Sequence, residues 1–133
     1  NTNLATLETS NQAIKTAVEG TLSVSSPTLT TTNTLLVDNI SVAAAATETT
    51  SSVDMDGVRR ISVFGTAEDT AANIITQVSS DDTTWYDNSE ETIYLTSDGF
   101  MKTINNDVRY IRWKYVNGAG EAKTLTLNAS YKK

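Results

Sequence analysis

The chain of 133 residues contains no cysteine, no histidine and only one proline. Without cysteine it has neither a disulfide framework nor a thiol nucleophile, and without histidine it has no imidazole base or histidine metal ligand. These absences exclude Ser-His-Asp and Cys-His catalysis and a Cys/His zinc site. We therefore predict a protein that is not an enzyme, with no catalytic residues, no cofactor and no metal ion.

Cations and long apolar runs are also scarce. The chain has 10 Lys and Arg residues and 16 Asp and Glu residues, which gives a net charge of −6. We expect no Lys/Arg cluster, and an acidic chain repels a polyphosphate backbone, so we predict no nucleic-acid partner. The longest apolar run, Val42–Ala46, is far shorter than the roughly 18 residues that cross a bilayer, so we predict no membrane insertion.

Apolar residues before Gly20 follow the heptad spacing of a coiled-coil seam. The expected seam residues are Leu4, Leu7, Asn11, Ile14 and Val18. A helix of about 18 residues is marginal alone in water, so its narrow apolar stripe needs a covering surface. That surface is either the protein's own domain or another copy of the chain. The polar Asn11 at a core position favours a second copy of the chain as the covering surface, because such residues set register and oligomer state in coiled coils. Gly20 suits the helix C-cap.

Hydroxyl residues dominate the chain after the helix, since the sequence has 23 Thr and 13 Ser. Residues 21–34 form a Thr-rich arm that either adds a strand to a neighbour's sheet or lies along its own surface. Beyond it, segments rich in Thr, Val, Ile and Tyr alternate with turn sequences. The expected strands are Leu35–Asp38, Ile40–Ala44, Ser52–Met55, Arg59–Phe64, Ile74–Ser79, Thr92–Thr96, Phe100–Ile104, Val108–Val116 and Ala122–Tyr131. This spacing predicts a mainly β fold, an antiparallel sandwich of jelly-roll or Greek-key type with a short N-terminal helix.

Alternation within three strands predicts which side chains enter the core. The expected inward residues are Ile61 and Val63, then Ile111, Trp113 and Tyr115, then Leu125, Leu127 and Ala129. Arg112 and Lys114 face the other way, toward solvent or a neighbouring subunit. We expect Arg59, Arg60, Arg109 and Arg112 to form ion pairs between subunits.

The remaining side chains that could act in catalysis are paired carboxylates. Asp81-Asp82 and Glu90-Glu91 flank Trp85-Tyr86, and two acids beside an aromatic ring would suit glycoside hydrolysis. Adjacent acids in a Ser/Thr-rich turn are usually solvated loop residues, however, so this is not our prediction. Asp54-x-Asp56 resembles the start of a calcium loop but lacks the closing glutamate.

The two aromatic residues of the polar segment 81–89 have two interpretations. Trp85 either folds back to plug one end of the sandwich or, with Tyr86, contacts a ligand such as a sugar. In the second case the turns Ser97–Gly99 and Asn117–Gly120 would complete the ligand surface.

Two hairpin segments resemble a known family. Gln77–Trp85 ends in a serine, an acidic turn and a tryptophan, and Val108–Arg112 reads Val-Arg-Tyr-Ile-Arg. This pair is similar to the signature of discoidin-like sandwiches. That family's flanking disulfide and ligand-binding spikes have no match here, so the resemblance implies the sandwich and not its ligands.

The order of segments along the whole chain resembles small virion proteins of tailed bacteriophages. It comprises the helix, the Thr-rich arm, the segment Asp54–Gly65, the Trp85 hairpin and the strand with Arg109–Arg112. The resemblance implies assembly without catalysis, as a trimeric head-decoration (cement) protein. A tail or head fibre, or a carbohydrate-binding receptor-adhesion module, is the alternative.

This interpretation divides the chain into three parts. Residues 1–20 are the helical oligomerisation stem, 21–51 the Thr-rich arm with the first strands, and 52–133 the sandwich body. The expected partners are copies of the chain in a homotrimer and the major capsid protein or another virion protein. A host surface glycan is the further candidate. The expected location is the virion, on the capsid surface or in a projecting fibre.

Overall fold

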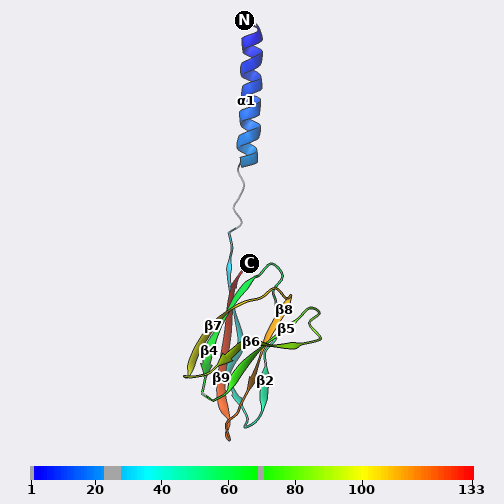
Figure 1. Ribbon diagram of the computed structural model, residues 1–133. Coiled ribbons are helices and arrows are strands. Elements are labelled where there is room, and N and C mark those ends of the chain that lie inside the picture. Colours follow the sequence, from blue (N-terminus) through cyan, green and yellow to red (C-terminus); the bar gives the residue numbers. More distant parts are fainter. Residues whose placement is uncertain (1, 23–27, 69–70) are drawn as a thin grey trace.

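The computed structural model describes residues 2–22, 28–68 and 71–133, and within the helix the side chains of residues 3–14. Helix α1 spans Thr2–Leu22 and projects away from the rest of the molecule (Figure 1). It continues through Gly20, so the predicted C-cap at that residue is wrong.

The remaining described elements form two antiparallel sheets. One sheet has the order β1-β9-β4-β7, and the other has the order β2-β8-β5-β6 with β3 also paired to β8. The strands are β1 (Thr31–Val42), β2 (Thr47–Thr49), β3 (Val53–Asp54), β4 (Arg60–Ala67), β5 (Asn73–Ser79), β6 (Tyr86–Tyr94), β7 (Gly99–Asn105), β8 (Tyr110–Val116) and β9 (Lys123–Lys132). We call the sheet that contains β1 the β1 sheet, and the sheet that contains β2 the β2 sheet.

The strand pairs are nested along the chain. The first strand pairs with the last, β2 and β3 pair with β8, β4 pairs with β7, and the β5–β6 hairpin lies innermost. A long antiparallel ribbon rolled in this way is a jelly roll. The predicted fold class is therefore confirmed: a mainly β, antiparallel sandwich preceded by a helix.

Strand β1 differs from the expected pattern in two ways. The last four residues of the expected arm, Thr31–Thr34, pair with the end of β9 in the chain's own sheet, where β1 is an edge strand. Residues 23–27 of the expected arm lie outside the described residues. The two strands expected at 35–38 and 40–44 are one strand with register shifts. Asn39 has φ of 45° at one of these shifts, a left-handed conformation that asparagine tolerates, and its N–H donates to Thr126 Oγ1 at 3.1 Å.

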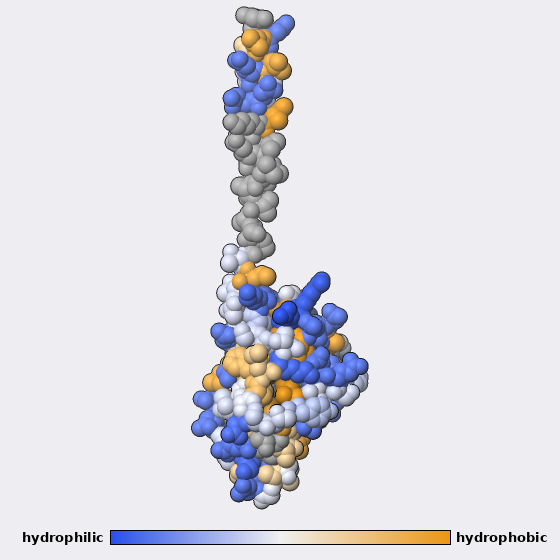
Figure 2. Space-filling view, turned by 60° about the vertical axis from the view of Figure 1, so that its left-hand side comes forward, coloured by the Kyte–Doolittle hydropathy of each residue, from blue (hydrophilic) through white to orange (hydrophobic). Residues whose placement is uncertain are grey.

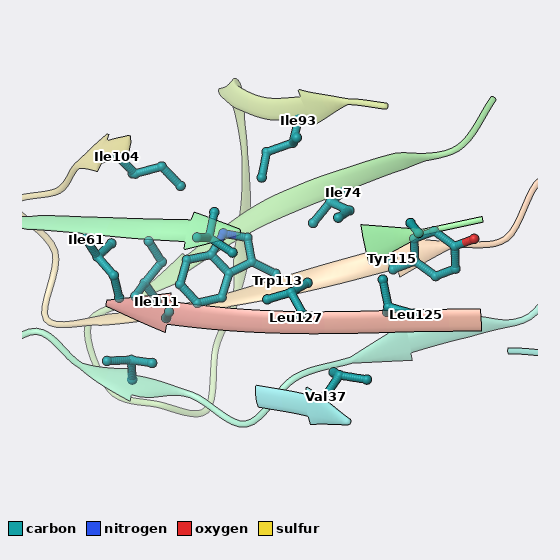
Figure 3. Close-up of a cluster of buried hydrophobic side chains, with 14 of the residues drawn as sticks. Val37, Ile61, Ile74, Ile93, Ile104, Ile111, Trp113, Tyr115, Leu125 and Leu127 are labelled. Carbon is teal, nitrogen blue, oxygen red and sulfur yellow. The ribbon is translucent and has the colours of Figure 1, made fainter. Parts of the chain in front are cut away.

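The core lies between the two sheets and contains the predicted inward residues (Figure 3). Fully buried side chains come from both sheets; they include Ile61, Val63, Ile111, Trp113, Tyr115, Leu125, Leu127 and Ala129. Arg112 and Lys114 alternate with the buried residues of β8 and lie on the outer face of the β2 sheet. The two-residue period of the sequence thus positions the polar side chains on the outer faces of the sandwich.

Candidate interaction surfaces

The predicted seam residues lie on the surface of α1. The side chains of Leu4, Leu7 and Ile14 are 55%, 57% and 62% exposed, and Asn11 is exposed with them. Figure 2 shows apolar residues along the helix among hydrophilic ones. The side chain of Val18, the fifth predicted seam residue, lies outside the described residues. The described apolar side chains are therefore not buried against the protein's own sheets, which was the other interpretation of the seam.

The four arginines proposed for intersubunit ion pairs differ in their surroundings. Arg59 and Arg60 are exposed and line an open groove. Arg109 forms an ion pair with Asp54 at 3.3 Å and lies over the Tyr110 ring. Arg112 contacts Gln77 of β5 and the ring of Trp85. The intersubunit role of these residues stays a prediction.

Trp85 lies on the outer face of the β2 sheet, just before β6. The Arg112 guanidinium lies over its ring, with Cζ 4.1 Å from the ring centroid. The Trp85 side chain is partly exposed, and the following Tyr86 is 65% exposed at the start of β6. Trp85 therefore does not plug the end of the sandwich, contrary to the structural interpretation of the sequence. Trp85 faces outward, as a ligand contact would require, whereas Tyr86 is paired with Val78, which is paired with the buried Ile111, so Tyr86 lies on the other face of the sheet at its exposed edge.

Polar side chains continue from Trp85 across the outer face of the β2 sheet. Arg112 Nε donates to Gln77 Oε1 at 2.8 Å, and Gln77 Nε2 donates to Asp87 Oδ1 at 2.6 Å. Lys114 Nζ lies 3.1 Å from Asp87 Oδ2. The hydrogen bond from Gln77, then the contact with Lys114, lowers the pKa of the Asp87 carboxyl below its usual value. The result is a connected polar network, held by three neighbouring strands, with an aromatic ring at its edge.

The paired carboxylates are either exposed or held in local contacts. Asp81 Oδ1 accepts hydrogen bonds from the N–H groups of Thr84 and Thr83 at 2.8 and 3.0 Å, which close the turn before Trp85. Asp82 and Glu90 are exposed, while Glu91 forms an ion pair with Lys102 at 3.1 Å. Among the described residues, no group of three acidic, cysteine or histidine side chains is arranged to hold a metal ion. Asp81 thus has a structural role in its loop.

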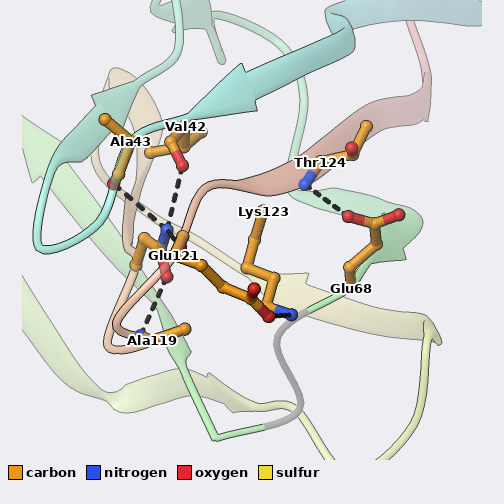
Figure 4. Close-up of polar contacts among 8 residues, drawn as sticks. Val42, Ala43, Glu68, Ala119, Glu121, Lys123 and Thr124 are labelled. Carbon is orange, nitrogen blue, oxygen red and sulfur yellow. Dashed lines mark hydrogen bonds and ion pairs between the residues drawn. The ribbon is translucent and has the colours of Figure 1, made fainter.

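One of the two turns expected to complete a ligand surface is built around a buried side chain. Asn117 is fully buried, and its Nδ2 donates to the carbonyls of Val42, Ala43 and Glu121 at 2.9, 3.1 and 2.9 Å. Its Oδ1 accepts from Ala119 N–H at 2.9 Å. Figure 4 shows these contacts between the end of β1 and the β8–β9 turn. The Asn117 side chain joins two loops and is not available to a ligand, so that part of the expected contact is wrong.

The structure thus combines a jelly-roll sandwich with a helix whose described apolar side chains are exposed. In the described part of the chain, no helix is both long and apolar enough to span a membrane. No protein-family model matches the sequence, and no curated protein matches it significantly.

Two solved structures share the sandwich fold. The PBSX exported protein XepA superposes with a TM-score of 0.62 at 16% identity, over 75% of this chain and 36% of XepA. The SPBc2 prophage-derived protein YomS superposes with a TM-score of 0.55 at 9% identity, over 79% of this chain and 95% of YomS. This chain therefore spans about a third of the length of XepA. At these identities the comparison establishes the fold.

Proposed function

We propose that the chain is a non-enzymatic structural protein of a bacteriophage virion, which forms a homotrimer through α1 and decorates the capsid. The observation that carries the proposal is the row of exposed seam residues, Leu4, Leu7 and Ile14, on a helix that projects from the sandwich. An isolated helix of this length is marginal in water, and burying its stripe against the same stripe of other copies stabilises it. The shared fold of two structures of prophage origin supports the phage assignment.

The sandwich suits the part of a decoration protein that stands on the shell. Its described surface carries hydroxyl, amide and charged side chains, and no group of three acidic side chains there is arranged to hold a metal ion. In this proposal the stem joins the copies, while the sandwiches contact the major capsid protein or another virion protein. The proposed location is the capsid surface.

Sedimentation equilibrium of the purified chain tests the stem. We expect the mass of a trimer for the wild type and of a monomer for the double variant Leu7→Asp, Ile14→Asp, because buried aspartates would oppose the seam. The matched control is Thr9→Asp, Ala13→Asp, which adds the same charge on the opposite side of the helix and should remain trimeric. A wild-type monomer, or a seam variant that stays trimeric, would contradict the proposal.

An electron-microscopy map of the phage particle tests the location. We expect sandwiches in threefold groups on the head surface. Density for the chain in the tail alone would favour the fibre alternative instead.

A glycan-binding module is the second candidate function, and the partly exposed Trp85 on the outer face of the β2 sheet favours it. Sugar rings stack on exposed aromatic faces, and the Arg112–Gln77–Asp87 network beside Trp85 offers hydrogen-bonding groups to hydroxyls. A glycan array should then show binding by the wild type that Trp85→Ala abolishes. Tyr94→Ala is the control, because Tyr94 is similarly exposed, at 69%, at the other end of β6. An array on which the wild type binds nothing would remove this candidate.

A further inference from the structure

Half of the chain's cations gather at the end of the sandwich where β1 begins. We call this surface the basic end; its five exposed residues are Arg59, Arg60, Arg109, Lys132 and Lys133. Arg59, Arg60 and Lys132 line an open groove of about 560 Å³. Arg59 and Arg109 line an adjoining groove of about 390 Å³, and Gly57 belongs to both. The Lys133 side chain lies beside Gly57, which lines both grooves, because its Cε is 3.9 Å from the position that a Cβ on Gly57 would occupy.

The fold brings these cations together from three separate segments. Strand β4 begins at Arg60 and runs antiparallel to β9, which ends at Lys132, so the start of one lies beside the end of the other. Arg109 directly precedes β8 and is tied to Asp54 at 3.3 Å. Backbone hydrogen bonds between Thr30 and Lys133 fix the C-terminal segment beside the start of β1. The sequence contains only the pairs Arg59-Arg60 and Lys132-Lys133, which predict no Lys/Arg cluster. That expectation is wrong for the folded chain, because the fold joins both pairs and Arg109 at one end of the sandwich.

Much of this positive charge is available to a partner. Three carboxylates lie in the same region: Asp54, Asp56 and Asp107. Asp54 forms an ion pair with Arg109. The hydrogen bond from the Asp56 N–H, and to a smaller extent Arg109, lowers the pKa of the Asp54 carboxyl. Within the described part of the chain, none of Arg59, Arg60 and Lys132 forms an ion pair. The rest of the chain holds the other 13 carboxylates against five cations.

Apolar surface lies beside these cations. Leu29, which is 62% exposed, and the partly exposed Tyr131 line the same groove as Arg59, Arg60 and Lys132. Carboxylates of a partner would be attracted to the cations, and an apolar side chain could cover Leu29 and Tyr131. A polyphosphate fits less well, because it offers no apolar side chain and meets the three local carboxylates and the acidic remainder of the chain.

We propose that the basic end binds an acidic polypeptide segment of another protein, with carboxylates at Arg59, Arg60 and Lys132 and an apolar side chain on Leu29 and Tyr131. This inference rests on the groove and its charges and does not depend on the stem. It identifies which end of the sandwich meets a protein partner and the chemistry that this partner presents.

Fluorescence anisotropy with a labelled glutamate-rich peptide containing a central leucine tests the proposal on the full chain. We expect binding that weakens about 10-fold or more as NaCl rises from about 0.05 M to about 0.5 M. Lys132→Glu should weaken binding about 10-fold. Lys123→Glu is the matched control, because it makes the same charge change at the opposite end of β9 and should leave binding nearly unchanged.

Further variants separate the possible outcomes. Arg60→Gln removes one cation without adding a carboxylate and should weaken binding less than Lys132→Glu, whereas Leu29→Ser should weaken it without changing its salt dependence. Circular dichroism confirms that each variant is folded. The proposal is overturned if the wild type does not bind the peptide, or if Lys123→Glu and Lys132→Glu weaken binding equally. Tighter binding of a single-stranded DNA of the same charge would overturn it in favour of nucleic acid. None of these results depends on whether the chain is trimeric.

Discussion

The guanidinium of Arg112 lies over the ring of Trp85, with Cζ 4.1 Å from the ring centroid. Arg112 also donates to Gln77 at 2.8 Å, so its position is fixed by the β2 sheet and not by the loop that carries Trp85. The arginine therefore holds the tryptophan flat against the outer face of the sheet. One face of the ring is covered by the cation, so a ligand would stack on the other face.

This stack should contribute measurably to stability. We expect Trp85→Ala and Arg112→Ala each to lower the free energy of unfolding, and a double-mutant cycle in urea to give a coupling of about 1 kcal/mol. The reason is that a partly desolvated cation–π contact is lost in either single variant. A coupling near zero would mean that the two side chains are merely adjacent.

Gly65 should tolerate no side chain. A Cβ at this residue of β4 would lie 2.0 Å from the backbone oxygen of Thr126 on β9, and backbone cannot move aside as a flexible side chain can. We expect Gly65→Ala to lower the free energy of unfolding by about 3 kcal/mol, as measured by denaturant titration. Gly120→Ala is the control, because a Cβ there meets no atom within 4 Å. Similar effects of the two changes would contradict this account.

Asn117 should be essential to the end of the sandwich that its amide holds together. Asn117→Ala would leave the buried carbonyl of Val42 without its 2.9 Å donor and would remove two further bonds of the same amide. We expect a loss of about 3 kcal/mol in the free energy of unfolding. The exposed Asn105 on β7 is the comparison, and Asn105→Ala should stay within about 0.5 kcal/mol of the wild type.

Acid should destabilise the protein partly through Asp81. Hydrogen bonds from the N–H groups of Thr84 and Thr83, and then from the Ser79 hydroxyl, lower the pKa of this carboxyl from its ordinary value of 3.8. A group whose pKa is depressed by folding stabilises the fold above its unfolded-state pKa, and this contribution is lost as pH falls through the folded-state value. We therefore expect the free energy of unfolding to decrease as pH drops below about 4.

Two asparagine variants test this assignment. Asp81→Asn should make the decrease with falling pH shallower, because the titrating carboxylate is gone. Asp82→Asn is the matched control for folding, since Asp82 is the exposed neighbour and asparagine accepts its φ of 60°. Equal slopes for the wild type and Asp81→Asn would assign the acid sensitivity to other carboxylates.

The alternation of side chains made much of the sandwich predictable. Ile111, Trp113 and Tyr115 must share one face of any strand that contains them, and their size and apolarity direct that face inward. The same rule put Arg112 outside. It could not say which strand lies beside β8, because pairing between distant segments depends on contacts that local periodicity does not contain.

The ends of strands and the positions of side chains in polar segments were less predictable from the sequence. Thr31–Thr34 has little apolar content and was expected to be an arm, yet it pairs with β9, because backbone hydrogen bonds to a neighbouring strand do not require apolar side chains. The sequence alone is compatible with two positions of Trp85, and the position of Arg112 on β8 decides between them. The stem seam could be identified from heptad spacing alone, since that pattern is local.

The sequence by itself determined the mainly β class, the inward faces of the strands and the apolar stripe of the helix, because each of these follows from the periodicity of neighbouring residues. Only the tertiary structure decided the nested pairing of the strands, the burial of Asn117 and the position of Trp85. It also decided the basic end, where cations from residues 59–60, 109 and 132–133 meet. These features join residues far apart in the chain, and their geometry is fixed by packing and backbone pairing between whole strands.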